Sequence, residues 1–153
     1  KWDFQKFQPD VIVVNSDLLI QKEEKRRLYQ IIDEEGEEGF KAIENRVNAS
    51  IDTENTVIAT GGSVVYCSEA MEHLKSIGKV VYLSLSLESL EKRLGNLKKR
   101  GVLLKEGQTL KSLYEERVPL YEKYADIVVD EEGKDLEASL QALLETLQTG
   151  VIK

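Results

Sequence analysis

Four short runs of mostly β-branched residues, separated by longer segments of helical periodicity, constrain the fold of this chain more than any other feature. A strand with one face in water alternates apolar and polar side chains, whereas a strand buried on both faces is apolar throughout. Continuous runs of this kind therefore predict strands of a parallel sheet that is covered on both faces. The runs are Val11–Val14, Val57–Thr60, Val80–Leu83 and Ile127–Val129.

The segments that flank these runs carry apolar residues at three- and four-residue steps, which predicts helices. They are Ser16–Lys22, Arg27–Asp33, Glu37–Ala49, Glu69–Ile77, Leu87–Lys99, Thr109–Lys123 and Leu136–Gln148. Because strands and helices alternate, we expect an α/β fold with three αβα layers and a mostly parallel sheet. A length of 153 residues with 41% hydrophobic content predicts a single domain over 1–153. The segment 100–108, which contains two glycines, is expected to be a mobile, lid-like loop.

Charge and cysteine content narrow the class of protein. A net charge of -7 disfavours proteins whose main task is to bind nucleic acid or an anionic membrane. The single Cys67 excludes an internal disulfide, and no apolar run approaches the roughly 18 residues of a membrane span. Cys67 and the single His73 have no neighbours at metal-ligand spacing, so both are predicted to be structural. We expect a soluble, cytoplasmic protein.

Two positions at predicted strand ends suggest a ligand site. The phosphate-loop motif G-x-x-x-x-G-K-[ST] does not occur. Gly61 and Gly62 in "VIATGGS" therefore indicate either close approach of another ligand or a tight turn. Asp17 follows the first strand, where open α/β sheets place their ligands. Asn15, Ser16 and Asp17 are also residue types that cap helices, so a capping role for Asp17 stays open.

Taken in order, five strings resemble the shikimate kinase family over residues 15–147. They are "NSDLLI", "IIDEEGEEGFKAIE", "VIATGGSVV", "VVYLSLSLESLEKRL" and "LYEERVPLYEKYADIVVD". The resemblance implies a P-loop-kinase-like fold with a five-stranded parallel sheet. It also implies a transferase of aromatic amino acid biosynthesis that uses ATP and Mg²⁺ to phosphorylate the 3-hydroxyl of shikimate.

The resemblance further implies the acceptor-binding residues. In the family, the second acid of a D-[TS]-D string binds substrate hydroxyls and takes up the released proton. In this chain that acid is Asp17. Lys41 replaces an arginine that binds the shikimate carboxylate, so it keeps the charge but loses the bidentate fork, and Glu44 holds the position of its ion-pair partner. The full implied substrate set is Asp17, Lys41, Gly61, Gly62, Ser63 and Arg117, with Ser63 in place of a third glycine.

On the nucleotide side, the resemblance implies that Arg93 stacks on adenine and that Arg100, in the lid, closes over the transferred phosphate as a catalytic residue. The string after Arg100 has one residue more than the family pattern and no proline. Asn15 replaces the acid that lies near the magnesium ion. An amide carries no charge, so we expect Asn15 to support a metal only weakly.

The first fifteen residues depart from the family, which has a P-loop strand, loop and helix before the D-[TS]-D string. Here "KWDFQKFQPDVIVVN" resembles a strand block of SGNH-type esterases, without their G-D-S, G-x-N-D or D-x-x-H strings. Residues 1–15 are therefore interpreted as a replaced or foreign helix-strand piece joined to a shikimate-kinase-like part, 16–150, that lacks the first strand. Three interpretations follow: a shikimate kinase domain inactive for want of the ATP cradle, a non-enzymatic engineered or rearranged chimera, and a residual hydrolase. A sheet without its P-loop strand also predicts a homodimer or a strand-swapped assembly.

Overall fold

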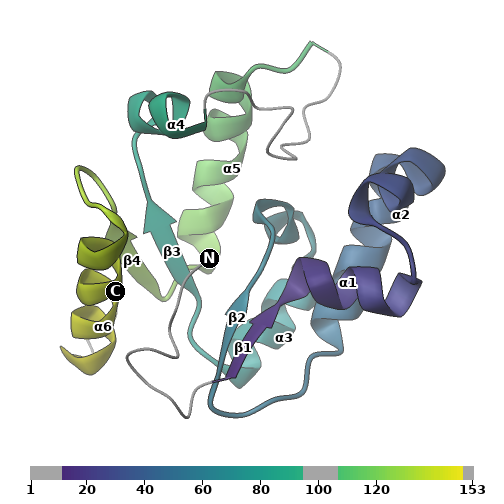
Figure 1. Ribbon diagram of the computed structural model, residues 1–153, viewed down its shortest axis with the longest axis horizontal. Helices are drawn as coiled ribbons and strands as arrows, with labels where there is room; N and C mark the ends of the chain where they lie inside the picture. Colours follow the sequence, from purple (N-terminus) through teal and green to yellow (C-terminus); the bar gives the residue numbers. More distant parts are fainter. Residues whose placement is uncertain (1–11, 95–106, 150–153) are drawn as a thin grey trace. The chain divides into compact units, whose positions relative to one another are not determined.

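The computed structural model describes residues 12–94 and 107–149 (Figure 1). These residues belong to two units that divide after Gly78. Most of the predicted foreign segment 1–15, the greater part of the lid, 100–106, and Arg100 itself lie outside the described residues. Each unit is described separately below, and the single-domain organisation stays a prediction.

The first unit is built on a pair of parallel strands. Strand β1 (Ile12–Asn15) pairs with β2 (Thr56–Ala59) in a register that runs from Ile12 opposite Thr56 to Asn15 opposite Ala59. The predicted first strand therefore lies beside the strand that leads into the glycines. The connecting and following segments are α1 (Ser16–Glu24), α2 (Leu28–Ala49), the 3-10 turn η2 (Gly62–Tyr66) and α3 (Ser68–Ile77).

Helix α2 is interrupted at Gly36, where φ is 69° and ψ is -175°. Residues with a side chain rarely adopt a positive φ, so glycine permits the break at this position. The interruption falls between the two helices predicted from the sequence, Arg27–Asp33 and Glu37–Ala49. It separates an amino-terminal part, which contributes Ile31 to the core, from a longer part that contributes Phe40 and Val47.

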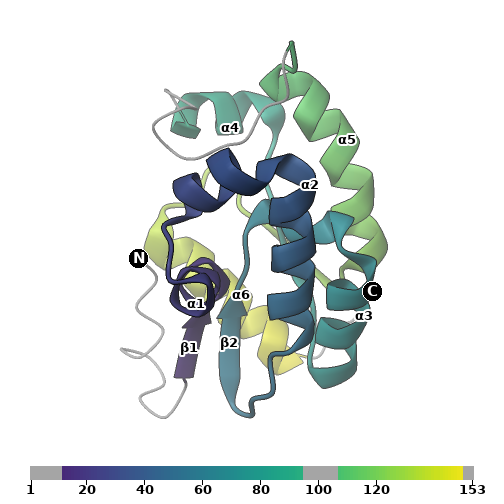
Figure 2. The ribbon, with the colours of Figure 1, turned by 90° about the vertical axis from the view of Figure 1, so that its right-hand side faces the viewer.

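The core of the first unit lies between helices. Ile20 of α1 meets Ile31, Phe40 and Val47 of α2, and each of the four is at most 4% exposed. Figure 2 shows α2 and α3 side by side, and Ala70, Met71 and Leu74 of α3 are buried. Full burial of such an aliphatic side chain stabilises the folded state by about 1.5–3 kcal/mol. The apolar periodicity of the sequence thus determines which helix faces meet.

The second unit repeats the parallel arrangement. Strand β3 (Val81–Ser84) pairs with β4 (Ile127–Asp130), beginning with Val81 opposite Ile127. The helices of this unit are α4 (Leu87–Leu94), α5 (Leu110–Tyr124) and α6 (Leu136–Thr149). The Tyr82 ring of β3 stacks on Tyr121 of α5 with 5.1 Å between ring centroids. Within the described ranges of both units, no helix combines the length and apolar character needed to cross a bilayer.

The predicted α/β fold with parallel strands is confirmed, while one detail of the prediction is wrong. The described strands form two pairs, β1 with β2 and β3 with β4, and in the part of the chain that is described the other edges of β2 and β3 meet no strand. Continuous apolar runs had predicted burial on both faces, yet Ile12 is 57% exposed and Val128 38%. A two-stranded sheet has too few neighbouring elements to cover all of its side chains.

Candidate functional site

The carboxyl ends of β1 and β2 bring several of the predicted residues together. Because Asn15 lies opposite Ala59 in the parallel register, the residues that follow each strand emerge at the same edge of the sheet. Asp17 lies in the first turn of α1 there, Gly61 precedes the 3-10 turn, and Gly62 and Ser63 begin it. Open α/β sheets bind ligands at such an edge. We therefore take this edge as the candidate site.

Asn15 caps α1, since its side chain accepts a hydrogen bond from the Leu18 backbone N–H at 3.1 Å. Asn15, Ser16 and Asp17 are all residue types that cap helices, and the structure gives this role to Asn15 rather than to Asp17. The amide oxygen of Asn15 is also engaged by this bond. The described residues contain no group of three or more His, Cys, Asp or Glu side chains that could hold a metal ion. Mg²⁺ is usually held by one or two carboxylates together with substrate phosphates, and the amide of Asn15 brings no charge to such a site.

Ser16 is completely buried and attaches the start of α1 to α2. Its hydroxyl donates to Asn48 Oδ1 at 2.8 Å, and Asn48 Nδ2 donates to the Glu44 carbonyl oxygen at 2.8 Å. Asn48 is also completely buried. The first turn of α1, which carries Asp17, is thus held in place by a buried polar chain. The sequence analysis did not find this chain, because its members are 32 residues apart.

Gly61 is surrounded by two carboxylates. A Cβ atom at this position would lie 3.3 Å from Asp17 Oδ1 and 3.3 Å from Glu44 Oε1, closer than most Cβ contacts in proteins. The backbone angles of Gly61, φ -67° and ψ 153°, are accessible to any residue. Limited space rather than backbone conformation therefore favours glycine here. Asp17 and Glu44 both approach the end of β2. Glu44 was expected to pair with Lys41, and its position beside Gly61 was not predicted.

The two carboxylates differ in their surroundings. Asp17 is half-buried, and this burial raises the pKa of its carboxyl group. Glu44 is completely buried and accepts a hydrogen bond from Ser63 Oγ at 2.9 Å. A carboxylate withdrawn from water needs such donors to remain ionised at low cost. The serine that replaces a third glycine thus has a partner within the site.

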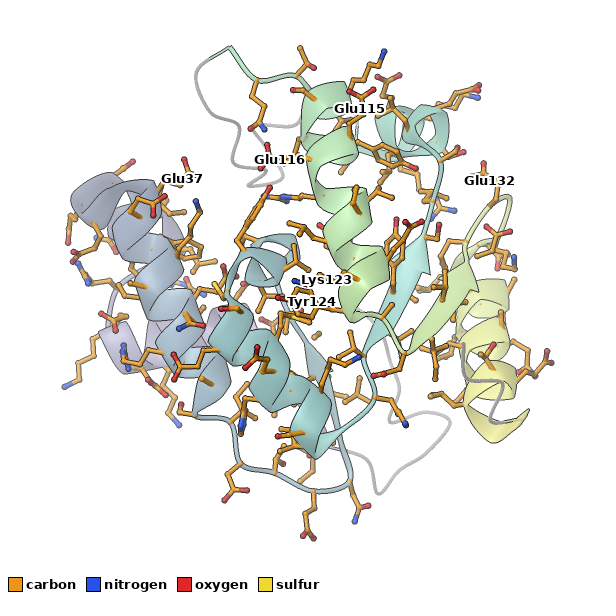
Figure 3. All side chains as sticks on the ribbon, turned by 180° about the vertical axis from the view of Figure 1, so that it is seen from behind. Glu37, Glu115, Glu116, Lys123, Tyr124 and Glu132 are labelled. Carbon is orange, nitrogen blue, oxygen red and sulfur yellow. The ribbon has the colours of Figure 1, made fainter. Side chains whose placement is uncertain are left out.

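Lys41 does not make the predicted ion pair. Its ammonium group lies 3.0 Å from Glu37 and 2.9 Å from Glu38, and no ion pair joins it to Glu44 within the described residues. A hydrogen bond to Glu38 and a weaker contribution from one to Glu37 raise the pKa of Lys41 to about 12. Glu37 projects from α2 beside its interruption (Figure 3), where a flexible lysine reaches it more easily than it reaches the core. The Lys41 ammonium also lies 5.3 Å from the centroid of the Tyr66 ring.

The second unit carries the remaining predicted residues. Arg117 is half-buried on α5. Arg93, on α4, donates from Nη2 to the carbonyl oxygens of Glu131 at 3.1 Å and Lys134 at 2.8 Å, which ties the loop after β4 to this helix. In the same loop Glu132, labelled in Figure 3, accepts hydrogen bonds from the Ser89 hydroxyl and the Ser86 backbone, and these lower the pKa of its carboxyl group.

Cys67 and His73 are held by backbone carbonyl oxygens. Burial, with a smaller contribution from Glu44, raises the pKa of Cys67 to about 11, which makes its thiol a poor nucleophile. His73 Nε2 lies 2.7 Å from the Ile51 carbonyl oxygen. An open depression of about 310 Å³ lies elsewhere, at the turn between α1 and α2. It is lined by Gln21, Lys22, Lys25, Arg26, Arg27 and Gln30.

Comparison with known proteins gives a consistent result. The family model described as shikimate kinase matches residues 8–148. The chain is 39% identical over 124 residues to a shikimate kinase of Francisella tularensis subsp. novicida, covering 78% of this chain and 70% of the relative. It is 36% identical over 137 residues to that of Dictyoglomus turgidum, covering 86% and 80%.

Solved structures agree with these matches. Shikimate kinase from Acinetobacter baumannii in complex with shikimate superposes with a TM-score of 0.77 at 30% identity, covering 93% of this chain and 81% of that one. The structure of shikimate kinase from Aquifex aeolicus gives a TM-score of 0.75 at 30% identity, covering 97% and 88%. The fold of the described residues is thus that of these kinases.

Proposed function

This chain belongs to the shikimate kinase family, and we propose that it forms the acceptor-binding part of that family's reaction, the transfer of the γ-phosphate of ATP to the 3-hydroxyl of shikimate. The observation that carries the proposal is the grouping of Asp17, Gly61 and Ser63 at the carboxyl ends of two parallel strands. The Acinetobacter baumannii relative, which shares this fold, was solved with shikimate.

Asp17 is the proposed contact for the acceptor hydroxyls. As a carboxylate it can accept two hydrogen bonds from neighbouring hydroxyls and take up the proton that the attacking hydroxyl loses. Crowding around Gly61 restricts where the Asp17 carboxylate can lie. The buried chain from Ser16 to Asn48 holds the helix turn that carries it. These restraints favour a preorganised acceptor site.

The proposed partners of the shikimate carboxylate are Arg117 and Lys41. The guanidinium of Arg117 can hold a carboxylate through two parallel hydrogen bonds. The Lys41 ammonium is already held by Glu37 and Glu38, so a bound carboxylate would have to compete with both glutamates. We therefore assign the larger share of carboxylate binding to Arg117.

We further propose that the 153 residues alone bind shikimate without phosphorylating it. They contain no G-x-x-x-x-G-K-[ST] string, whose backbone N–H groups and lysine hold the phosphates in P-loop kinases. When bound, ATP with Mg²⁺ would supply the phosphoryl group. Arg93 is the proposed adenine contact and Arg100, which lies outside the described residues, the proposed phosphate contact. Without the preorganised donors, we expect ATP affinity no better than millimolar and little effect of magnesium.

The test is a titration of the isotope-labelled chain with shikimate, followed by NMR. We expect millimolar binding, equivalent to about 4 kcal/mol, and Arg117→Ala should remove it from the measurable range, because losing one partner of a desolvated charge pair costs about 2–5 kcal/mol. Lys111→Ala is the matched control on the same helix, because Lys111 is exposed and pairs only loosely with Glu115 at 3.8 Å. Chemical shifts that do not change with millimolar shikimate would contradict the proposal and favour a non-enzymatic scaffold.

A coupled ATP assay on the same preparation tests the second part. We expect no shikimate 3-phosphate above a control without protein over several hours. Product that is lost in Asp17→Asn would show that the chain has another way to hold the phosphates.

We also propose that the chain associates with itself. Within the described residues β2 pairs with β1 alone and β3 with β4 alone, and an unpaired apolar strand edge favours pairing with another chain. Sedimentation over a wide concentration range should therefore show a homodimer or a strand-swapped assembly. A strictly monomeric particle throughout would contradict this proposal.

A further inference from the structure

The fully buried carboxylate of Glu44 accepts a hydrogen bond at the turn after β2 from Ser63, which stands in place of the third glycine of the family pattern. Its Oε1 atom lies 3.3 Å from the point where a Gly61 Cβ would be, as does Asp17 Oδ1. Burying a carboxylate costs free energy unless donors compensate for the lost water. Ser63 Oγ is such a donor, 2.9 Å from Glu44 Oε1.

The basic residue one turn earlier on α2 does not take this role. The Lys41 ammonium is held by Glu37 and Glu38 and makes no ion pair with Glu44 within the described residues. Glu44 Oε1 accepts a hydrogen bond from a hydroxyl that comes from a different segment, 19 residues away. That hydroxyl lies 3.8 Å from the same Cβ point of Gly61, so both side chains belong to one small cluster.

We propose that Ser63 is a positioning residue for acceptor binding, because its hydroxyl fixes the Glu44 carboxylate and thereby restricts the Asp17 carboxylate to the acceptor side. Two carboxylates near one point repel each other, so the orientation of one limits the other. Without the Ser63 hydroxyl, Glu44 Oε1 loses this donor and can turn towards Asp17. The inference rests on the proposed function, which makes Asp17 the contact for the acceptor hydroxyls.

The experiment is a double-mutant cycle on Ser63→Ala and Glu44→Gln, with shikimate affinity measured by NMR and stability by urea unfolding. Ser63→Ala should raise the Kd for shikimate about fivefold, because a hydrogen bond to a charged group is lost. In the Glu44→Gln background the same change should cost about twofold, since the acceptor is neutral. Ser63→Thr, which keeps a hydroxyl, should restore the parental Kd to within about twofold.

Ser50→Ala is the matched control. The Ser50 hydroxyl donates to the Val47 carbonyl oxygen at the end of the same helix, away from the cluster, so its loss should leave the Kd unchanged. If Ser63→Ala binds shikimate as tightly as the parent, or if Ser63→Thr fails to restore binding while unfolding like the parent, the inference is wrong.

The experiment distinguishes failure of the proposed function from failure of the inference about Ser63. If the parental chain does not bind shikimate at all, the proposed acceptor function fails. The unfolding cycle then tests the link between Ser63 and Glu44 by itself. Additive effects of the two changes on stability would overturn the link, and non-additive effects would support it.

Discussion

Replacing Gly61 by alanine tests the claim that two carboxylates crowd the turn after β2. The new Cβ would lie 3.3 Å from Asp17 Oδ1 and from Glu44 Oε1. Asp17 can move towards solvent, because it is half-buried at the start of its helix. Glu44 has less freedom, since it is completely buried and hydrogen-bonded to Ser63. The strain should therefore fall on Glu44 and on the backbone of the turn.

The magnitude follows from two opposing effects. Overpacking a closely packed site costs typically about 1–3 kcal/mol. Replacing glycine by alanine at accessible backbone angles returns about 0.4–1 kcal/mol, because the unfolded chain loses freedom. We expect Gly61→Ala to lower the free energy of unfolding by about 1–2 kcal/mol. Since Asp17 must shift, shikimate affinity should fall by about tenfold or more, equivalent to 1.4 kcal/mol.

Urea unfolding measures the first effect and NMR titration with shikimate the second. Gly78→Ala is the matched control, because its Cβ would meet nothing nearer than the Leu74 carbonyl oxygen at 3.9 Å. We expect this control to be neutral or slightly stabilising. Equal stability of Gly61→Ala and the parent, or equal costs at both glycines, would refute the crowding argument.

Three further predictions concern single side chains. Burial raises the pKa of Asp17, so folding favours the neutral carboxyl group, and the stability that this group contributes is lost as pH rises through the folded pKa. In urea unfolding, Asp17→Asn should therefore be more stable than the parent at pH 7, and the difference should vanish below about pH 4. Ser16→Ala leaves the buried Asn48 oxygen without its donor and should cost about 1–3 kcal/mol in urea unfolding, and a loss below a few tenths would contradict the buried chain. Because the pKa of Cys67 is raised to about 11, iodoacetamide should modify it slowly at pH 8 and rapidly in urea, and rapid modification of the folded chain would show that the thiol is exposed.

Sequence alone was sufficient for the class of fold, the order of the elements and the family. These depend on local patterns: apolar runs predict the strands, three- and four-residue steps predict the helices, and the gap between the predicted helices Arg27–Asp33 and Glu37–Ala49 contains the break in α2. Motif strings located the cluster around Asp17 and Gly61, which the parallel register of β1 and β2 then brings to one edge. Strands, helices and motif strings can be predicted from sequence because residues close together in the chain determine them.

Tertiary structure alone decided which polar groups meet in that cluster. Motif position assigned Glu44 to Lys41, one turn away, yet the Lys41 ammonium lies with Glu37 and Glu38 outside the core. Glu44 instead accepts from Ser63, 19 residues later. The exposure of Ile12 likewise depends on how many strands flank β1, which its own residues do not specify. Partner choice and burial are set by distances and side-chain directions between segments that packing brings together, and no spacing along the chain encodes them.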